Sequence, residues 1–276
     1  MRYKIGDVAR ILGISPDLLR YYEKKGVVTP YKDVHNDYRY YDAWDINLLM
    51  DCLWFKNFGY SIEQIADMVR IPSAQELQAV FLDKEDELRA TIRRCELLLR
   101  RSEEHRAQLA SIPALLGKCE LADSPARLRY INRVGEEYPT GEGLERFARQ
   151  WLRALPFNHR YFEISREALF GGSEDDYRWG FSLETDYVRE LDFPTGAPME
   201  WAAPAHGIHT VFKSRGKGNF SPRHLDYALE WARQEGLTVS GPAQGVLMAS
   251  LLDEGELCGY FECWIPVTSD KEDSET

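Results

Sequence analysis

A carboxylate placed between two aromatic rings is the most distinctive chemical feature in the last third of this 276-residue chain. Residues 259–264 read GYFECW, and side chains alternate along a β-strand, so Tyr260, Glu262 and Trp264 are predicted to share one face. Buried carboxylates are rare unless they are paired. A desolvated acid among π faces would attract an apolar cation by charge and by cation–π contact. The alternative is that Glu262 bonds a backbone amide or pairs with an arginine, while the rings only fill the core.

Other residues on predicted strands could line the same site. They are four aromatic residues and a second acid: Tyr161, Glu163, Trp179, Phe181 and Trp201. For each ring, packing in the core is an equal alternative. Glu163, Glu262 and Tyr260 could also serve as general acids or bases in an enzyme. However, the sequence has no nucleophile elbow, phosphate loop or metal-ligand set to support that function.

A second group of residues, near the start of the chain, combines cations and phenols in a way that fits contacts to a phosphate backbone. Arg20 and Tyr21 lie in the second of two predicted helices, and Tyr38, Arg39 and Tyr40 end the loop that follows. Phosphate contacts position a protein on a duplex, and a few further side chains read base edges. The alternatives for a residue that approaches the bases are Ser15, Asp17 and Leu18.

Two short helices around a glycine are predicted to position these groups. Apolar residues recur at helical spacing over residues 5–12, and Gly13 ends that helix. Ser15 and Pro16 restart the chain as an N-cap followed by proline at the first helical position. This pattern is typical of a helix-turn-helix, whose second helix enters the major groove of DNA. The aromatic loop up to Tyr41 could form a wing, and Tyr22 is the tyrosine predicted to be core.

These motifs resemble the winged-helix head of MerR-type transcription regulators. The resemblance is carried by residues 3–9, LRYYE at 19–23, Gly26, YRYY at 38–41, and residues 48–69 with GYSIEQI at 59–65. It covers roughly the first quarter of the chain. In that family the recognition-helix arginine and the wing's Tyr-Arg pair hold the DNA backbone, which implies such roles for Arg20, Tyr38 and Arg39. The resemblance further implies double-stranded promoter DNA and RNA polymerase as partners.

Three more helices are predicted before the strand-rich second part of the chain begins. Residues 42–57 have a buried apolar stripe. Ser61 is an N-cap with Gln64 at the capping-box position and starts a helix over 61–69, and Pro72 ends this part. Residues 75–111 lack Gly and Pro, and Pro113 and Gly117 are expected to close that long helix. It carries an imperfect heptad: Phe81, Leu88, Cys95, Ser102 and Leu109, with Ile92 and Leu99 between. In MerR-like proteins the corresponding helix pairs antiparallel in a homodimer; the alternative is a helix lying on its own domain.

The remainder is predicted to contain a βαββ unit twice, with each helix covering one face of the sheet. The strands are 128–134, 160–165 and 177–183, then 207–213, 245–252 and 258–265, and the helices are 143–155 and 222–235. This order resembles the GyrI-like small-molecule-binding fold found behind MerR heads in BmrR-like multidrug sensors. In those sensors a glutamate at this place on the last strand faces the bound cation, which implies that role for Glu262.

Composition limits the remaining classes. The chain carries a net charge of −11, but residues 1–60 have nine Lys/Arg against eight Asp/Glu, so the acidity lies in the remainder. DNA affinity must then depend on individual cations. Without an apolar run of about 20 residues or a signal peptide, we expect a cytoplasmic protein that does not enter a membrane. Five cysteines without a CxxC pair indicate reduced thiols, and although Cys119 lies where metal-sensing relatives place a ligand, we expect no metal and no cofactor.

The expected fold class is α+β. The predicted domains are a winged helix-turn-helix (1–72), a coiled-coil dimerisation helix (73–112), a GyrI-like domain (120–268) and a disordered tail (269–276). The predicted function is that of a homodimeric activator that bends and untwists promoter DNA and senses a small hydrophobic cation or aromatic molecule. The alternatives are a repressor or architectural DNA binder whose second domain only makes interactions, or a GyrI-like domain with hydrolase activity.

Overall fold

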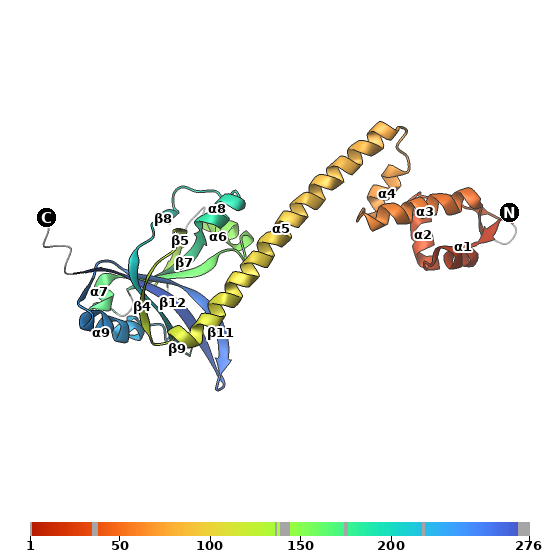
Figure 1. Cartoon of the computed structure of the whole chain (residues 1–276). Helices are drawn as coiled ribbons and strands as arrows, with labels where there is room; N and C mark the ends of the chain where they lie inside the picture. The colour runs from red at the N-terminus through yellow and green to blue at the C-terminus, as the bar shows by residue number, and fades with distance from the viewer. Residues whose placement is uncertain are drawn as a thin grey trace. The chain divides into compact units, whose positions relative to one another are not determined.

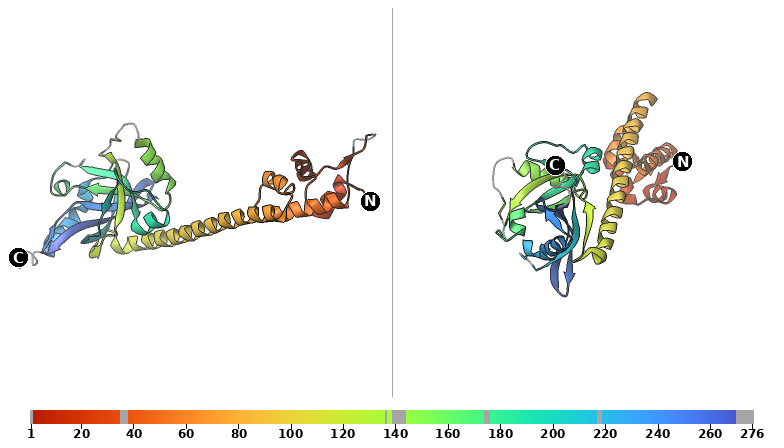
Figure 2. Two further views of the ribbon diagram at one scale, coloured as in Figure 1. Left: turned by 90° about the horizontal axis from the view of Figure 1, so that it is seen from above. Right: turned by 60° about the vertical axis from the view of Figure 1, so that its left-hand side comes forward.

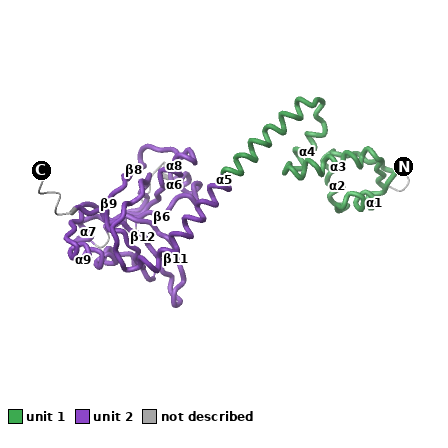
Figure 3. The backbone as a smooth tube through the Cα atoms, in the orientation of Figure 1, with its two compact units in different colours: residues 1–93 green, residues 94–276 purple. Residues whose placement is uncertain are grey.

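The computed structural model describes residues 2–34, 38–135, 137–138, 144–173, 176–216 and 219–269. The chain forms two compact units, residues 1–93 and 94–276, which are coloured separately in Figure 3. Helix α5 (Ala74–Leu115) is continuous in every view and contributes residues to both units (Figures 1 and 2). Each unit is described separately below.

The first unit is a helix-turn-helix with a small antiparallel sheet in the order β1-β3-β2. Before α5, its elements are β1 (Tyr3–Lys4), α1 (Ile5–Leu12), α2 (Pro16–Lys24), β2 (Tyr31–Lys32), β3 (Arg39–Tyr41), α3 (Ala43–Asn57) and α4 (Ile62–Met68). Val8, Leu19, Tyr22 and Ile65 are fully buried in one core. The prediction that Tyr22 is a core residue is therefore confirmed.

Helices α1, α2 and α4 of the first unit begin or end at capping residues predicted from the sequence. Gly13 ends α1 with φ of 66°, a left-handed conformation that glycine adopts without a Cβ penalty. The Ser15 hydroxyl accepts a hydrogen bond from the Leu18 amide at 3.1 Å and so caps α2. Ser61 and Gln64 form the predicted capping box at α4.

Helix α5 is 42 residues long and continues two residues past Pro113, to Leu115. The expectation that Pro113 closes the helix was therefore slightly wrong. A proline removes one backbone hydrogen bond to the preceding turn, and close to a helix end little of the helix lies beyond the lost bond. Four residues at heptad-like spacing, Leu88, Ile92, Cys95 and Leu99, are exposed on this helix.

In its described residues, the second unit is an antiparallel sheet of nine strands with short helices. Eight strands follow the order β4-β9-β12-β11-β6-β7-β5-β8, and β10 pairs with β12. The strands are β4 (Cys119–Asp123), β5 (Arg127–Val134), β6 (His159–Ile164), β7 (Tyr177–Glu184), β8 (Glu200–Ala202), β9 (His206–Arg215), β10 (Leu237–Val239), β11 (Ala243–Asp253) and β12 (Glu256–Ser269). The helices are α6 (Leu144–Arg153), α7 (Arg166–Leu169), α8 (Thr185–Glu190), η1 (Pro222–Leu225) and α9 (Asp226–Gln234).

The duplicated βαββ unit predicted from element order is confirmed. The first copy is β5-α6-β6-β7 and the second is β9-α9-β11-β12. In each copy the last strand lies between the other two, and the copies join where β11 pairs antiparallel with β6. The two copies therefore have the same internal strand order and meet in the middle of one sheet.

The strand register gives this sheet one polar and one apolar face. Tyr161 lies across from Val246, which lies across from Glu262, and directly opposed residues point to the same side. The other side carries two adjoining apolar clusters, one packed on Trp151 of α6 and the other on Leu229 of α9. Helices α6 and α9 therefore cover the same, apolar face. The face that carries Glu262 is not covered by either of them.

Two expectations concern the limits of the chain. Ser269 belongs to β12, and the rest of the predicted tail, residues 270–276, lies outside the described residues. Among the helices that the structure describes, none combines the length and the apolar character needed to cross a membrane.

Candidate functional site

Glu262 lies on the polar face of the sheet with two hydrogen-bond partners. Its side chain belongs to β12 and the residue is only 7% exposed. One carboxylate oxygen lies 3.0 Å from His209 Nε2 on β9. The other accepts a hydrogen bond from Gln108 Nε2 on α5 at 3.2 Å. The pairing is thus to an imidazole and an amide, rather than to the arginine or backbone amide considered from the sequence.

His209 is held between two acids and an indole ring. It stacks on Trp264 with ring centres 4.8 Å apart, and its Nδ1 lies 3.0 Å from Glu120 on β4. Burial alone lowers the pKa of His209, but hydrogen bonds to Glu262 and Glu120 outweigh it, so the pKa is raised above its ordinary value. The geometry favours an imidazolium that bridges two carboxylates.

A second cation, Arg127, also lies close to Trp264. The Arg127 guanidinium lies 5.0 Å from the indole ring and 3.8 Å from the Glu184 carboxylate. Burial lowers the pKa of Arg127, while Glu184 and Glu262 act in the opposite direction. A hollow of about 10 Å³ adjoins these groups, lined by Ser124, Pro125, Arg127, Tyr161, Gln244, Gly245 and Trp264. That volume fits about one water molecule, not an organic ligand.

The second candidate acid, Glu163, is neutralised inside the sheet. It is 1% exposed and forms ion pairs with Arg129 and Arg178. The Tyr161 hydroxyl lies 3.2 Å from the same carboxylate and 3.0 Å from the Gln244 side-chain oxygen. Tyr161 and Glu163 thus share the polar face with Glu262, but their polar atoms are already hydrogen-bonded or ion-paired within the protein.

Three of the residues predicted to line the ligand site lie away from Glu262 in the structure. Trp179 lies on the opposite face, packed against aromatic residues such as Phe220, and Phe181 stacks on Trp151 there. Trp201 is 53% exposed on the edge strand β8. Alternation along one strand shows which of its residues share a face. Whether that face is the one that carries Glu262 depends on the register between strands, which the sequence does not contain. Tyr260 shares the Glu262 face but lies beside Lys213, whose ammonium is 5.5 Å from the ring.

In the first unit, the predicted DNA-contacting residues of α2 are tied to neighbouring acids. Arg20 pairs with Asp17 at 2.5 Å, and both side chains are largely exposed. Tyr21 donates to Glu63 at 3.1 Å, and Lys25 pairs with the same carboxylate at 2.7 Å, which lowers the pKa of Glu63 to about 2. The Ser15 hydroxyl is used in capping, and Leu18 packs partly against the core.

The wing strands carry the other predicted contacts. Arg39 is partly buried, and its Nε donates to Glu23 of α2 at 2.5 Å, which fixes β3 against that helix. Tyr38 is 55% exposed, with the Lys4 ammonium 5.3 Å from its ring, and Tyr40 is partly buried. Residues 35–37, between the wing strands, lie outside the described residues.

Metal ligands are not brought together in the described part of the chain: it contains no group of three or more His, Cys, Asp or Glu placed to hold an ion. Cys119 is partly buried, and burial raises the pKa of its thiol. Raised thiol pKa values disfavour the thiolate that binds metals.

Sequence reasoning missed His209, Gln108 and Arg127 as neighbours of Glu262. His209 lies on the predicted strand 207–213, but no local pattern relates it to Glu262. Gln108 comes from α5, and its contact with a strand 154 positions later has no local signal. Alternation along residues 127–131 predicts that Arg127 and Arg129 share a face of the sheet. It does not predict that this is the face of Glu262.

Comparison with known proteins is informative for the first unit. Residues 3–70 match the family model "MerR HTH family regulatory protein". An uncharacterised HTH-type transcriptional regulator from Synechocystis, slr0701, is 37% identical over 73 residues, which are 26% of this chain and 53% of the relative. CueR, an HTH-type transcriptional regulator from Escherichia coli O157:H7, is 28% identical over 120 residues, covering 44% and 85% of the two chains. The chain therefore spans only about half the length of the first of these relatives.

Among solved structures, a cryo-EM structure of an EcmrR–DNA complex covers 97% of this chain and 100% of its own. The sequence identity is 13% and the TM-score is 0.35. At that score the similarity carries no conclusion about the second unit.

Proposed function

We propose that this chain, whose residues 3–70 form a MerR-family helix-turn-helix domain, is a DNA-binding transcription regulator controlled by a small molecule. The observation that carries the proposal is the family match over residues 3–70 together with the helix-turn-helix fold of the same stretch. Arg20 and Tyr21 on α2 and Tyr38, Arg39 and Tyr40 on the wing are the proposed phosphate contacts. Ser15, Asp17 and Leu18 lie at the start of the recognition helix, where base contacts are made in such folds.

The proposed active form is a homodimer joined through α5. Its support is the exposed stripe Leu88, Ile92, Cys95 and Leu99, whose spacing matches the seam of a coiled coil. Leu99 is 62% exposed and Ile92 is 57% exposed, so the single chain leaves this stripe in water. A second copy of the helix would bury it, and two heads would then engage two half-sites.

Glu262 is the proposed effector contact, with Trp264 and Tyr161 beside it. Its present partners are exchangeable in principle: a cationic ligand could replace the His209 imidazole and the Gln108 amide. Because Gln108 belongs to α5, losing that hydrogen bond would loosen the sheet from the helix on which the dimer depends. A ligand that prefers one geometry of the dimer would shift the population toward it.

The proposed action on DNA follows from deformation energy. A dimer that holds both half-sites can bend and untwist the DNA between them, at an energy cost offset by the contacts at both ends. RNA polymerase is the partner that would use the altered promoter.

The experiment begins with selection of bound duplexes from a random library by the full chain, followed by footprinting. A pseudo-palindromic site protected in two halves is the expected result. Transcription by RNA polymerase from a template with that site then separates activation from repression. Failure to enrich any sequence would overturn the proposal, and repression that no added compound relieves would favour the architectural or repressor alternative.

A further inference from the structure

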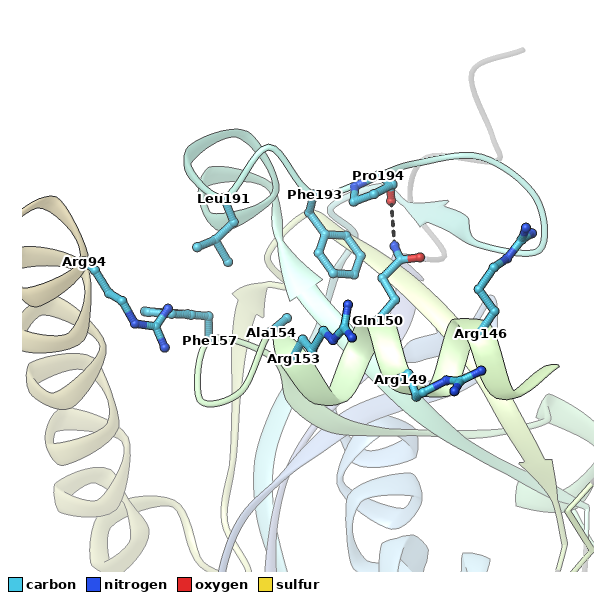
Figure 4. A pocket seen from close by; sticks show the side chains of 10 residues that line it. All are labelled: Arg94, Arg146, Arg149, Gln150, Arg153, Ala154, Phe157, Leu191, Phe193 and Pro194. Atoms are coloured by element: carbon cyan, nitrogen blue, oxygen red, sulfur yellow. Dashed lines mark hydrogen bonds between the residues drawn. The ribbon is translucent and has the colours of Figure 1, made fainter. Parts of the chain in front are cut away.

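A large hollow in the described part of the second unit lies away from Glu262 and contains none of its hydrogen-bond partners. It has a volume of about 580 Å³, within the usual range for small-molecule sites of roughly 300–1,000 Å³. Helices α5 and α6 and the segments that follow α6 and α8 supply its lining. The lining residues are Arg94, Arg146, Arg149, Gln150, Arg153, Ala154, Phe157, Leu191, Phe193 and Pro194 (Figure 4).

The lining is strongly cationic. It contains four arginines and, among the described residues, no carboxylate. Arg149 lies 3.9 Å from Glu145, but both are largely exposed, so this pair neutralises little of the charge. Arg94, Arg146 and Arg153 have no carboxylate within ion-pair distance in the described part of the chain. A positive cluster is notable because the whole chain carries a net charge of −11.

The helix itself does not explain the arrangement. On α6 the cations at positions 146, 149 and 153 and Gln150 follow the i, i+3, i+4, i+7 spacing of one helix face. Like charges at such spacings destabilise a helix by a few tenths of a kcal/mol per pair. The adjacent face of α6 carries Trp151 and Ala154, which are buried in the core. The repulsion among these arginines destabilises α6, and packing of the helix against the core does not depend on them. Core packing therefore does not explain why the three cations lie on one face.

Apolar groups form the base of the hollow. Phe157 is 1% exposed and Phe193 is 8% exposed. The Arg94 guanidinium carbon lies 5.7 Å from the Phe157 ring. In Figure 4 the Arg94 head group lies beside Phe157, and Arg153 extends below Phe193. Arg94 therefore contacts one ring of the apolar base, and Arg153 and Phe193 line the same hollow.

We propose that this hollow binds a small organic anion with an aromatic or apolar body. The anionic group would lie between Arg94 and Arg153, because guanidinium forks match the geometry of carboxylates and phosphates. The body would lie against Phe157, Phe193 and Leu191. Gln150 presently donates to the Pro194 carbonyl at 3.4 Å, a weak bond that its amide could exchange for the ligand.

This site goes beyond the proposed effector contact, since its charge preference is opposite. Glu262 selects a cation, whereas the arginine hollow selects an anion. It also joins α5 to α6, so an occupant would tie the helix to the sheet domain through Arg94.

The test is a titration of the full chain with naphthoate, followed by calorimetry. Naphthyl phosphate, inorganic phosphate and the neutral naphthalene methanol serve as comparison probes. We expect naphthoate or naphthyl phosphate to bind and the neutral alcohol to bind at least about tenfold more weakly. Whichever of the two anions binds more tightly identifies the head group, and weak binding of inorganic phosphate shows the contribution of the apolar base.

Variants locate the binding. Arg94→Gln and Arg153→Gln should each weaken naphthoate about tenfold. Arg106→Gln, an exposed arginine of α5 outside the hollow, is the matched control and should change nothing. Glu262→Gln should also leave naphthoate affinity unchanged, so this site can fail or succeed independently of the effector proposal. Equal affinity for the neutral alcohol, unchanged affinity in both arginine variants, or no binding at millimolar concentrations would overturn the assignment.

Discussion

Glu163 and Glu262 are buried acids on the same face of one sheet, but their partners differ in kind. Glu163 is paired with two guanidinium groups, which stay charged at any ordinary pH. Glu262 is paired with His209 and Gln108, one titratable and one neutral. Glu262 is therefore the acid whose environment can change with pH or with a ligand.

The His209 imidazolium predicts a pH-dependent stability. A raised folded-state pKa contributes stability that is fully present below the unfolded pKa of about 6.5 and is lost as pH rises through the folded pKa. His209→Gln should therefore destabilise the protein more at about pH 6 than at about pH 9. Urea unfolding of both proteins at the two pH values measures this difference.

The charged groups that contact His209 are Glu262 and Glu120; Gln108 shares the Glu262 carboxylate, and Arg127 lies 5.0 Å from the Trp264 ring on which His209 stacks. His159, whose pKa burial lowers, is present in both proteins and cancels from the comparison. The control is His206→Gln, an exposed histidine 2.7 Å from Asp123. A variant difference that is constant with pH would show that folding does not shift the pKa of His209.

Arg39 predicts how the wing contributes to DNA affinity. Arg39→Ala should weaken binding to all sequences by a similar factor and lower the salt slope by about one. It also leaves Glu23 without a partner that lies at 2.5 Å, which adds a negative charge near the phosphates. Fluorescence anisotropy at several salt concentrations gives both quantities. Arg10→Ala, which removes the same charge from an exposed site on α1, should have a smaller effect, and equal losses would assign the result to net charge alone.

Two buried tyrosines of the first unit predict opposite responses to loss of the hydroxyl. The Tyr22 hydroxyl is buried without a partner among the described residues, so Tyr22→Phe should leave the free energy of unfolding unchanged or raise it by up to about 1 kcal/mol. The Tyr60 hydroxyl donates to the Val80 carbonyl at 3.1 Å, so Tyr60→Phe should cost about 1 kcal/mol. Denaturant unfolding measures both, and a clear loss in Tyr22→Phe would reveal an unseen partner.

At the scale of elements, α5 differs along its length. Its second half is fastened to the sheet domain by side chains that leave the helix on one side. Arg100 forms a two-point contact with Glu190 of α8 at 2.8 and 2.7 Å, Arg101 donates to the Pro156 carbonyl at 3.0 Å, and Gln108 reaches Glu262. The stripe of Leu88, Ile92, Cys95 and Leu99 remains exposed. This helix thus packs one surface against its own domain, and the opposite surface is the one through which we propose that it dimerises.

Self-association through this stripe predicts that a charge within it separates the subunits. Ile92→Glu and Leu99→Glu would bury an unpaired carboxylate in the proposed seam, at a cost of several kcal/mol. Sedimentation velocity should then show a shift from dimer to monomer. Ala90→Glu places the same charge on the opposite, exposed side of the helix and should leave the dimer intact. Wild-type protein that sediments as a monomer would contradict the seam.

At the scale of the whole molecule, the proposed function requires that ligand binding to the sheet domain change DNA binding by the first unit. The two compact units share α5, and Gln108 of that helix contacts the proposed effector acid. Coupling in this scheme is a difference in ligand affinity between states of the dimer.

Glu262→Gln is predicted to separate ligand response from DNA binding. The variant should keep operator affinity, because the substitution lies outside the first unit, but lose affinity for a cationic effector by about tenfold or more. Calorimetry with an effector found by a thermal-shift screen, together with a transcription assay, measures both. Unchanged effector affinity would remove Glu262 from the site.

The sequence alone determined the elements with strong local signals. Glycine and capping chemistry at Gly13, Ser15 and Ser61 specified the helix-turn-helix, and strand alternation predicted that Tyr260, Glu262 and Trp264 share a face. These features depend on neighbouring residues, so their physics is contained in short stretches of chain.

Only the tertiary structure decided which residues of different strands and helices contact one another on each face of the sheet. The pairing of β11 with β6 placed Tyr161 on the side of Glu262 and Trp179 on the other side, and no local pattern contains that register. The contact of Gln108 with Glu262 and that of Arg94 with Phe157 join segments tens of residues apart, and so does the hollow that Arg94 and Arg153 both line. Such contacts arise from the packing of whole elements, which is why the arginine hollow had no signal in the sequence.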